Sequence, residues 1–479
     1  MRRVLLAALT GLLGLTALSA VGAGSGAAGG GFSAWFTGRT LRADYVDGGT
    51  ATDEWLGFSG WRVEGPWAGP RRTLIEDDPR GEYLAELRDP RGRVLYSVSF
   101  SGLFAEWQMT GPARRGERRA FAASVRVPEP RRPARLRILR RGPEDRFRVL
   151  LEQAYDPADR GVDRRPLERR GEVIPLRVTG PPAERFDLLI AGEGYTRDAR
   201  AKLLADARRL SGAWLATEPM RSLADRIDVR VLFVPSDEPG ITDPRRDRWR
   251  ASPFGCRYDS FGSDRYVLTF DERRLRELVA RAPYDALVLL VNERKYGGGG
   301  IYGLWATVSA DTAPAAYVFI HELGHSIGGL ADEYYTSSTS YEALPPVERE
   351  PPDPNVTALP GGRPRWADMV EPGTPIPTPW NKSAWDEMAR RYESRRRRII
   401  EAGGDDDAME ALFADQAREA SELLAHERYR GRVGAFEGAA YRSEGLYRPA
   451  LDCLMFRRGA GSFCPVCRKA LAGSILRFF

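Results

Sequence analysis

Residues 321–335 read HELGHSIGGLADEYY. His321 and His325 are four residues apart, so on a helix both imidazoles project from one face, at the separation that binds one zinc ion. Glu322 lies beside them, where a carboxylate can take a proton from an attacking water and pass it to a leaving amine. The stretch therefore predicts a zinc site carried by a helix.

Chance occurrence of this pattern on a buried helix is the alternative. The chain contains only three histidines, and two of them stand at ligand spacing. Pro314 suits the first turn of the helix, and Gly328 with Gly329 is expected to end it. A turn there lets the chain double back toward the metal, which favours a real site over chance.

A zinc ion needs a third protein ligand, and Ala331 stands where many zinc proteases have a third histidine. The donor types that suit zinc leave His426, a cysteine or a carboxylate. His426 lies in a charged helical segment and is interpreted as a surface residue. We expect Asp332 to be the ligand because it follows the turn closely, and Glu333 remains the alternative or a partner behind the ligands.

The chain has 479 residues, which is too long for one ordinary core. Residues 1–23 combine two arginines, an apolar run and small residues, and this pattern predicts a signal peptide. An uncleaved membrane anchor is the alternative. We expect export, a secreted or periplasmic location, and no stable membrane insertion after the signal is removed. Residues 24–31 are expected to form a flexible tether.

The rest of the chain divides by composition into two expected domains. Residues 32–154 alternate apolar and aromatic runs with turn residues, including DPRG at 89–92, and predict a β-sandwich. Residues 155–175 are rich in Pro, Arg and Asp and predict a linker. Residues 176–479 alternate strands with helices, which predicts a catalytic domain with a mixed, mostly parallel sheet, interrupted by a charged helical insertion at 381–430.

The charge of the chain bears on its partners. The formal net charge of +6 becomes +4 once Arg2 and Arg3 leave with the signal peptide. For a chain of this size that excess is no signature of nucleic-acid binding. A protein or peptide substrate is the expected partner, and no nucleic acid.

A glycine-rich segment precedes the histidine pair. It includes Gly298, Gly299, Gly300 and Ile301, and it lacks the spacing of a phosphate-binding loop. Glycine here would let a substrate backbone lie close, so that an extended peptide pairs with an edge strand above the zinc. A flexible loop without a ligand is the alternative.

These residues resemble the IgA-peptidase family of bacterial zinc metallopeptidases. Its pattern is HExxH followed by Gly-Leu-x-Asp-Glu-Tyr, which is Gly329, Leu330, Asp332, Glu333 and Tyr334 here. The other similar segments are 258–267, 284–303, 372–379, 434–441 and 444–456, and N-terminal segments such as 96–113. The resemblance implies an N-terminal β-sandwich and a zincin-like, metzincin-like α/β catalytic domain. It implies that His321, His325 and Asp332 bind zinc, that Glu322 is the general base, and that Met455 forms the floor of the site.

Three of the four cysteines, Cys453, Cys464 and Cys467, crowd the C-terminus, while Cys256 is distant in sequence. In an oxidising compartment we expect a disulfide from Cys453 to Cys464 or Cys467, which would hold the segment that carries Met455. A metal site of these three cysteines with Cys256 as fourth ligand is the alternative.

The sequence thus predicts a secreted or periplasmic zinc endopeptidase in which Glu322 activates the attacking water. A zinc amidase acting on cell-wall peptides would use the same residues on another substrate. A non-catalytic surface adhesion or carbohydrate-binding protein, with the tryptophan-rich N-terminal domain as the binding part and a structural zinc, is the third hypothesis.

Overall fold

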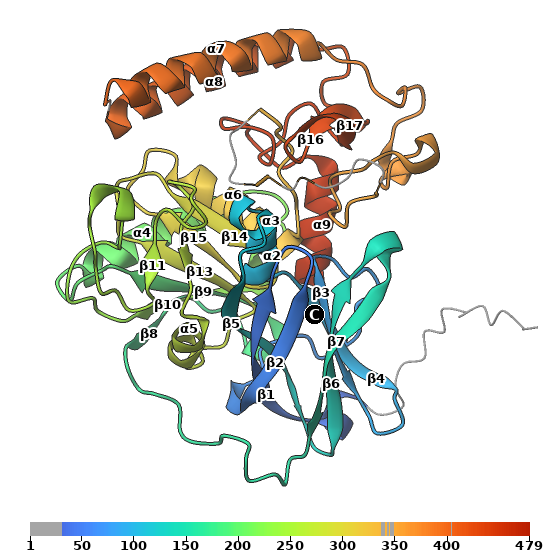
Figure 1. Cartoon of the computed structure of the whole chain (residues 1–479), viewed down its shortest axis with the longest axis vertical. Coiled ribbons are helices and arrows are strands. Elements are labelled where there is room, and N and C mark those ends of the chain that lie inside the picture. Colours follow the sequence, from blue (N-terminus) through green and yellow to red (C-terminus); the bar gives the residue numbers. More distant parts are fainter. Residues whose placement is uncertain (1–30, 337–340, 343, 345–348, 404) are drawn as a thin grey trace, which may run out of the picture.

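The computed structural model describes residues 31–336, 341–342, 344, 349–403 and 405–479. The predicted signal peptide lies outside these residues, as does all of the predicted tether except Gly31. Figure 1 shows the N-terminal strands in blue to teal, packed beside the sheet and helices drawn in green and yellow. None of the helices in the described ranges has both the length and the apolar character needed to cross a membrane.

The N-terminal region is β-rich, as predicted. Its two antiparallel sheets have the strand orders β2-β1-β5 and β4-β3-β6-β7. The strands are β1 (Phe36–Gly49), β2 (Glu54–Pro66), β3 (Tyr83–Arg88), β4 (Val94–Phe100), β5 (Arg119–Pro130), β6 (Ala134–Arg141) and β7 (Phe147–Tyr155). The short helices are α1 (Phe32–Trp35), α2 (Leu103–Gln108) and α3 (Gly111–Arg114). Leu41, Ala43 and Tyr45 alternate along β1, and Leu136 and Ile138 along β6, and all five are buried in one shared core. The two-residue period therefore turns one face of each sheet inward.

The connection between β3 and β4 is the predicted hairpin at 89–92. Asp89 Oδ1 accepts hydrogen bonds from the backbone N–H groups of Arg91 and Arg93, at 3.0 and 2.9 Å. Gly92 takes a left-handed φ of 86°, which a turn of this kind asks of glycine. The turn residues therefore set the register of the two strands.

The second half contains the mixed, mostly parallel sheet that the alternation of strands and helices predicts. Its strand order is β14-β15-β13-β9-β10-β8, with antiparallel pairs only at the two edges. The strands are β8 (Glu172–Arg177), β9 (Phe186–Glu193), β10 (Ile227–Phe233), β13 (Ala286–Val291), β14 (Gly298–Ile301) and β15 (Trp305–Ser309). A separate two-stranded pair is β11 (Cys256–Arg257) and β12 (Leu268–Thr269). Helices of this half are α4 (Arg200–Leu215), α5 (Glu272–Val279) and α6 (Ala315–Gly328).

Both faces of this sheet are covered, which explains its continuous apolar strands. On β9, Leu188 and Ile190 belong to a core that includes residues of α4 and α6. Leu189 and Ala191 belong instead to the core of the N-terminal sheets. The N-terminal region is therefore packed on one face of the sheet, and α4 and α6 on the other.

The predicted linker, residues 155–175, packs against strand β2. Asp163 O accepts a hydrogen bond from Val63 N on β2 at 2.9 Å, and the carboxylate of Asp163 pairs with Arg62 at 2.7 Å. β8 begins at Glu172, inside the segment expected to be linker, because residues 172–177 pair with β10.

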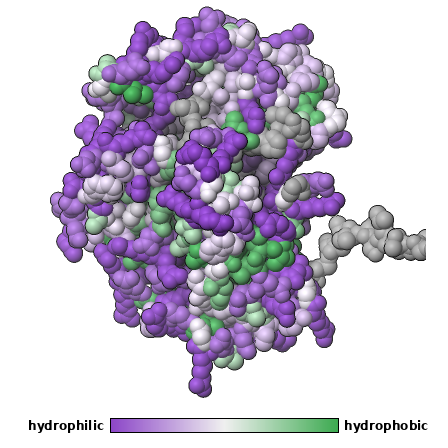
Figure 2. All heavy atoms as spheres, in the orientation of Figure 1, coloured by the Kyte–Doolittle hydropathy of each residue, from purple (hydrophilic) through white to green (hydrophobic). Residues whose placement is uncertain are grey.

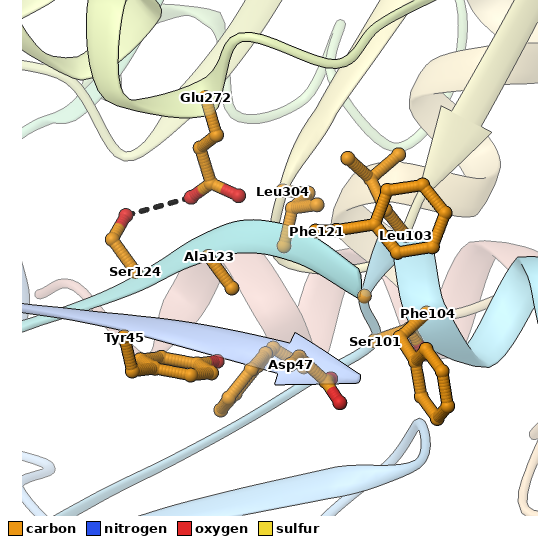
Figure 3. A pocket seen from close by; sticks show the side chains of 12 residues that line it. Tyr45, Asp47, Ser101, Leu103, Phe104, Phe121, Ala123, Ser124, Glu272 and Leu304 are labelled. Atoms are coloured by element: carbon orange, nitrogen blue, oxygen red, sulfur yellow. Dashed lines mark hydrogen bonds between the residues drawn. The ribbon is translucent and has the colours of Figure 1, made fainter. Parts of the chain in front are cut away.

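Buried polar contacts join the two halves at a cavity shown in Figure 3. Ser124 Oγ on β5 donates to Glu272 Oε1 at the start of α5, at 2.6 Å. Arg276 Nε donates to the same oxygen at 3.2 Å. Tyr45 and Asp47 of β1 line the cavity beside them. The interface therefore carries specific polar partners as well as apolar surface.

The charged segment 381–430 forms the two helices α7 (Lys382–Glu401) and α8 (Asp406–Ala425), as predicted. They project from the body as a pair (Figure 1) and their surface is mostly hydrophilic (Figure 2). Arg395 of α7 pairs with Asp415 of α8 at 3.1 Å, and Arg391 pairs with Glu419. The arginines of this segment therefore lie on a solvent-exposed face and form ion pairs between the two helices. The chain ends with the hairpin β16 (Phe436–Ala439) and β17 (Arg442–Arg448) and the helix α9 (Pro465–Leu476).

Candidate active site

Helix α6 presents the histidine pair and ends as its glycines predict. Gly329 adopts a left-handed φ of 56° and closes the helix. Its N–H donates to His325 O at 2.9 Å, and Leu330 N donates to Gly324 O at 3.3 Å. This cap reverses the chain, so that residues 330–333 return along the face of α6 that carries the histidines.

Three donor atoms meet there. His321 Nε2 lies 3.0 Å from Asp332 Oδ1, and His325 Nε2 lies 3.3 Å from the same oxygen. The two Nε2 atoms are 3.1 Å apart. Donor atoms about 2.1 Å from one tetrahedral metal ion lie roughly 3.4 Å from one another, so the three atoms fit a single ion.

Backbone carbonyls set the orientation of both rings. His321 Nδ1 lies 3.0 Å from Leu454 O, and His325 Nδ1 lies 2.6 Å from Leu330 O. A carbonyl only accepts, so each Nδ1 carries a proton, and the Nε2 lone pair of each ring is the one that a metal can take. Both lone pairs therefore point toward the carboxylate of Asp332, which is the arrangement that metal binding requires.

The electrostatics of the cluster also favour a cation. Burial alone would raise the pKa of the Asp332 carboxyl. The charges and hydrogen bonds of His325 and His321 instead hold this pKa well below its usual range. Burial lowers the pKa of His325, but the charge and hydrogen bond of Asp332, together with the charge of Glu322, outweigh burial and raise the pKa to about 10. A positive charge is thus stabilised here, and a divalent metal can take the place of the proton.

Glu322 extends from α6 toward the edge strand β14. A Cβ added to Gly298 would lie 3.1 Å from Glu322 Oε1. Burial raises the pKa of the Glu322 carboxyl, and the charges of His321 and His325 oppose that rise. A carboxylate with a raised pKa is a stronger proton acceptor, and this one lies on the helix of the two histidines, beside the sheet edge.

The glycines of β14 are required by close contacts within the protein. A Cβ on Gly298 would come within 2.8 Å of Val318, and one on Gly300 within 2.4 Å of Glu322 O. A Cβ on Gly299 would come within 2.5 Å of the Tyr266 ring on the other face. Ile301, the last residue of β14, is buried. Glycine is therefore needed so that β14 can lie directly against α6, a reason that the sequence alone did not show.

Two family models cover nearly all of the described chain. The model described as IgA Peptidase M64 matches residues 174–475, and the model described as Peptidase M64 N-terminus matches residues 31–152. The chain belongs to the IgA peptidase M64 family. It is a metallopeptidase, an enzyme that hydrolyses peptide bonds with the help of a metal. No curated protein matches the chain.

In this M64 peptidase Met455 packs directly beneath α6. Its side chain is fully buried, and a Cβ on Gly324 would lie 2.8 Å from its sulfur. Met455 O also accepts a hydrogen bond from Glu333 N at 2.9 Å. The glycine between the two histidines therefore makes room for the methionine, and the turn around Met455 supports the loop that carries Asp332.

The expected disulfide is not present in the structure. All four cysteines are free, and the sulfurs of Cys453 and Cys467 are 3.8 Å apart, whereas a disulfide requires about 2.05 Å. Cys256 is not beside them, because its backbone N–H donates to Glu193 in another part of the sheet domain. The carboxylate of Glu333 contacts Cys467 at 3.1 Å and is turned away from the histidines. His426 is exposed at the end of α8.

Sequence reasoning assigned no role to Tyr441, which the fold brings to the M64 site. Its hydroxyl donates to Asp332 Oδ2, the oxygen that faces away from His321. Ala440 and Tyr441 have left-handed φ values of 48° and 63° in the turn between β16 and β17, and Ala440 N donates to Asp332 O at 3.0 Å. Strained non-glycine residues of this kind concentrate at functional sites. The resemblance includes the segment 434–441, but no pattern within that segment indicates a role for Tyr441.

The N-terminal region also reaches the site. Glu106 of α2 accepts hydrogen bonds from the hydroxyls of Tyr266, at 3.0 Å, and Tyr341. The ring centroids of Tyr341 and Tyr441 are 5.8 Å apart. Tyr266 covers Gly299 of β14, so α2 fixes the position of the edge strand from the side opposite α6.

Proposed function

We propose that this M64 peptidase is an exported zinc endopeptidase. The observation that carries the proposal is the convergence of His321 Nε2, His325 Nε2 and Asp332 Oδ1 beside Glu322. Two imidazoles and a carboxylate form a donor set that zinc uses in hydrolases, with one position left for water or substrate.

When bound, the metal would polarise the scissile carbonyl and make water a stronger nucleophile. Glu322 would accept the proton of the attacking water and deliver it to the leaving amine, because its carboxylate lies beside β14 and close enough to His321 and His325 for their charges to lower its pKa. Asp332 would be held in place by Tyr441 through its second oxygen.

The substrate would bind as an extended strand along β14, the edge of the six-stranded sheet. Gly298 already pairs outward, since its N–H donates to Arg265 O and its carbonyl accepts from Val267 N, both at 3.2 Å. Substrate pairing is therefore proposed at Gly300, where the outer edge of the strand continues beyond that pairing.

The non-catalytic hypothesis requires a metal held by four protein ligands. Within the described ranges the histidine cluster contains three. A zinc amidase would share the same machinery, and a panel of unfolded proteins and cell-wall peptides separates it from the endopeptidase.

Zinc dependence has a direct test. Treatment with a strong chelator is expected to reduce hydrolysis of an unfolded protein by more than roughly 10⁴-fold, since the metal supplies several kcal/mol of transition-state stabilisation. Adding Zn²⁺ back should restore the rate, and Mg²⁺ should not, because two imidazoles are poor ligands for it. Metal removal is verified by elemental mass spectrometry. Full activity of the metal-free protein would refute the proposal.

Export is proposed from residues 1–23. When the full chain is expressed in a bacterial host, the protein recovered outside the cytoplasm is expected to begin near residue 24. Intact-mass measurement of that fraction locates the new N-terminus. Recovery of the uncleaved chain in the cytoplasm alone would count against export and leave the enzymatic proposal unaffected.

A further inference from the structure

A second group of side chains of the types that bind metals lies behind the histidine site. Glu333, Cys453, Cys464 and Cys467 are all buried, and one possible ligand atom from each lies within 4.8 Å of the others. The residues come from three segments: the loop after α6, the turn before Met455, and the start of α9. Nothing in the peptidase chemistry described above uses them.

The distances fit a tetrahedral ion. The sulfurs of Cys453 and Cys467 are 3.8 Å apart, and ligands about 2.3 Å from a tetrahedral zinc lie roughly 3.8 Å apart. Glu333 Oε1 is 3.1 Å from the sulfur of Cys467 and 4.0 Å from that of Cys464, around the roughly 3.5 Å expected for oxygen and sulfur on one zinc.

Backbone N–H groups surround the sulfurs as they do metal-bound thiolates. Cys453 Sγ accepts from Cys464 N at 3.2 Å and from Met455 N at 3.5 Å. Cys464 Sγ accepts from Cys467 N at 3.5 Å. Cys464 is also the N-cap of α9, a 12-residue helix whose N-terminal dipole favours negative charge.

The carboxylate of Glu333 is incompletely satisfied without an ion. Its Oε1 accepts from Asn355 Nδ2 at 3.1 Å, while its Oε2 is buried with no hydrogen-bond partner among the described residues. A buried carboxylate oxygen without a partner is costly, and a cation removes that cost. Arg448, fully buried nearby, carries a positive charge that offsets part of the negative charge. Burial lowers its pKa to about 10, and the charges of Tyr335, Glu333 and Cys453 oppose that fall.

We propose that Glu333, Cys453, Cys464 and Cys467 bind a second, structural zinc ion. Three thiolates and one carboxylate complete a four-coordinate sphere of soft and borderline donors, which selects zinc over magnesium or calcium and leaves no position for substrate.

This zinc would hold the floor of the active site in place. Glu333 follows Asp332 directly, and Cys453 precedes Leu454, whose carbonyl orients His321. Glu333 N also donates to Met455 O. One ion would therefore tie together the loop that carries Asp332, the Met455 turn and α9.

The test counts zinc per chain in the purified full-length protein supplied with Zn²⁺ alone. Two zinc ions are expected in the unaltered chain, and one in the double variant His321→Ala/His325→Ala. A mercurial reagent that binds thiolates should release one zinc from each protein. With Co²⁺ in place of zinc, a sulfur-to-cobalt charge-transfer band in the near ultraviolet should persist in the double variant.

Glu333→Gln tests the fourth ligand without removing a thiol. It is expected to release one zinc to a chelator roughly 10- to 100-fold faster than the unaltered chain. Cys256→Ser is the matched control, because it removes the remaining cysteine away from the cluster and should leave both zinc ions in place. One zinc in the unaltered chain, none in the histidine variant, or a disulfide among the three cysteines in the non-reduced mass would each overturn the proposal.

Discussion

Glu322→Gln is expected to lower the rate of peptide hydrolysis by roughly 10³-fold, about 4 kcal/mol in the barrier, while the zinc content stays unchanged. The amide keeps the size of the side chain but cannot accept the proton of the attacking water. His321, His325 and Asp332 are left intact, so the ion remains bound. The measurement is turnover of a quenched fluorescent peptide together with zinc counted on the same sample.

A matched control comes from the surface. Glu387 of α7 has a side chain that is 70% exposed, so Glu387→Gln removes the same charge far from the site. Both rate and zinc content should then stay at the level of the unaltered chain. If Glu322→Gln retained a full rate, Glu322 would not be the general base.

Asp332→Ala is expected to remove the zinc of the histidine site and to lower hydrolysis by more than roughly 10⁴-fold, because two imidazoles alone hold the ion weakly. Zinc per chain should fall by one. In the metal-free variant the pKa of His325, raised to about 10 by Asp332, should return toward its ordinary value, which NMR titration of the ring can follow.

Asp225→Ala is the control for Asp332→Ala, since the Asp225 side chain is fully exposed and its loss should change neither zinc nor rate. Retention of both zinc ions in Asp332→Ala would exclude Asp332 as a ligand. Because Glu333 contacts the cysteines, Glu333→Gln should affect the other ion and separate the two roles.

Adjacent residues on an extended loop project to opposite sides, and this separates Asp332 from Glu333. The sequence left both carboxylates open as ligands. In the structure Asp332 Oδ1 lies within 3.3 Å of both imidazoles, while Glu333 lies on the side of the cysteines. The direction in which the capped end of α6 returns makes that choice.

The cysteines show the limit of reasoning from sequence most clearly. Compartment and spacing favour a disulfide, because the local pattern contains only the cysteines themselves. The fourth member of their cluster is a carboxylate 120 residues earlier in the chain than Cys453, and no local pattern links the two. Tyr441 and Glu106 were missed for the same reason, since each reaches the site from a distant element.

The sequence by itself determined the helix, its histidine pair with Glu322 beside it, the hairpin at 89–92 and the alternation of strands and helices. These features depend on spacing and turn residues over short distances, where backbone geometry decides the outcome. Tertiary structure alone decided which carboxylate faces the histidines, why β14 requires glycine and what surrounds the cysteines. Those features depend on contacts between segments far apart in the chain, and side-chain direction at such contacts follows from packing.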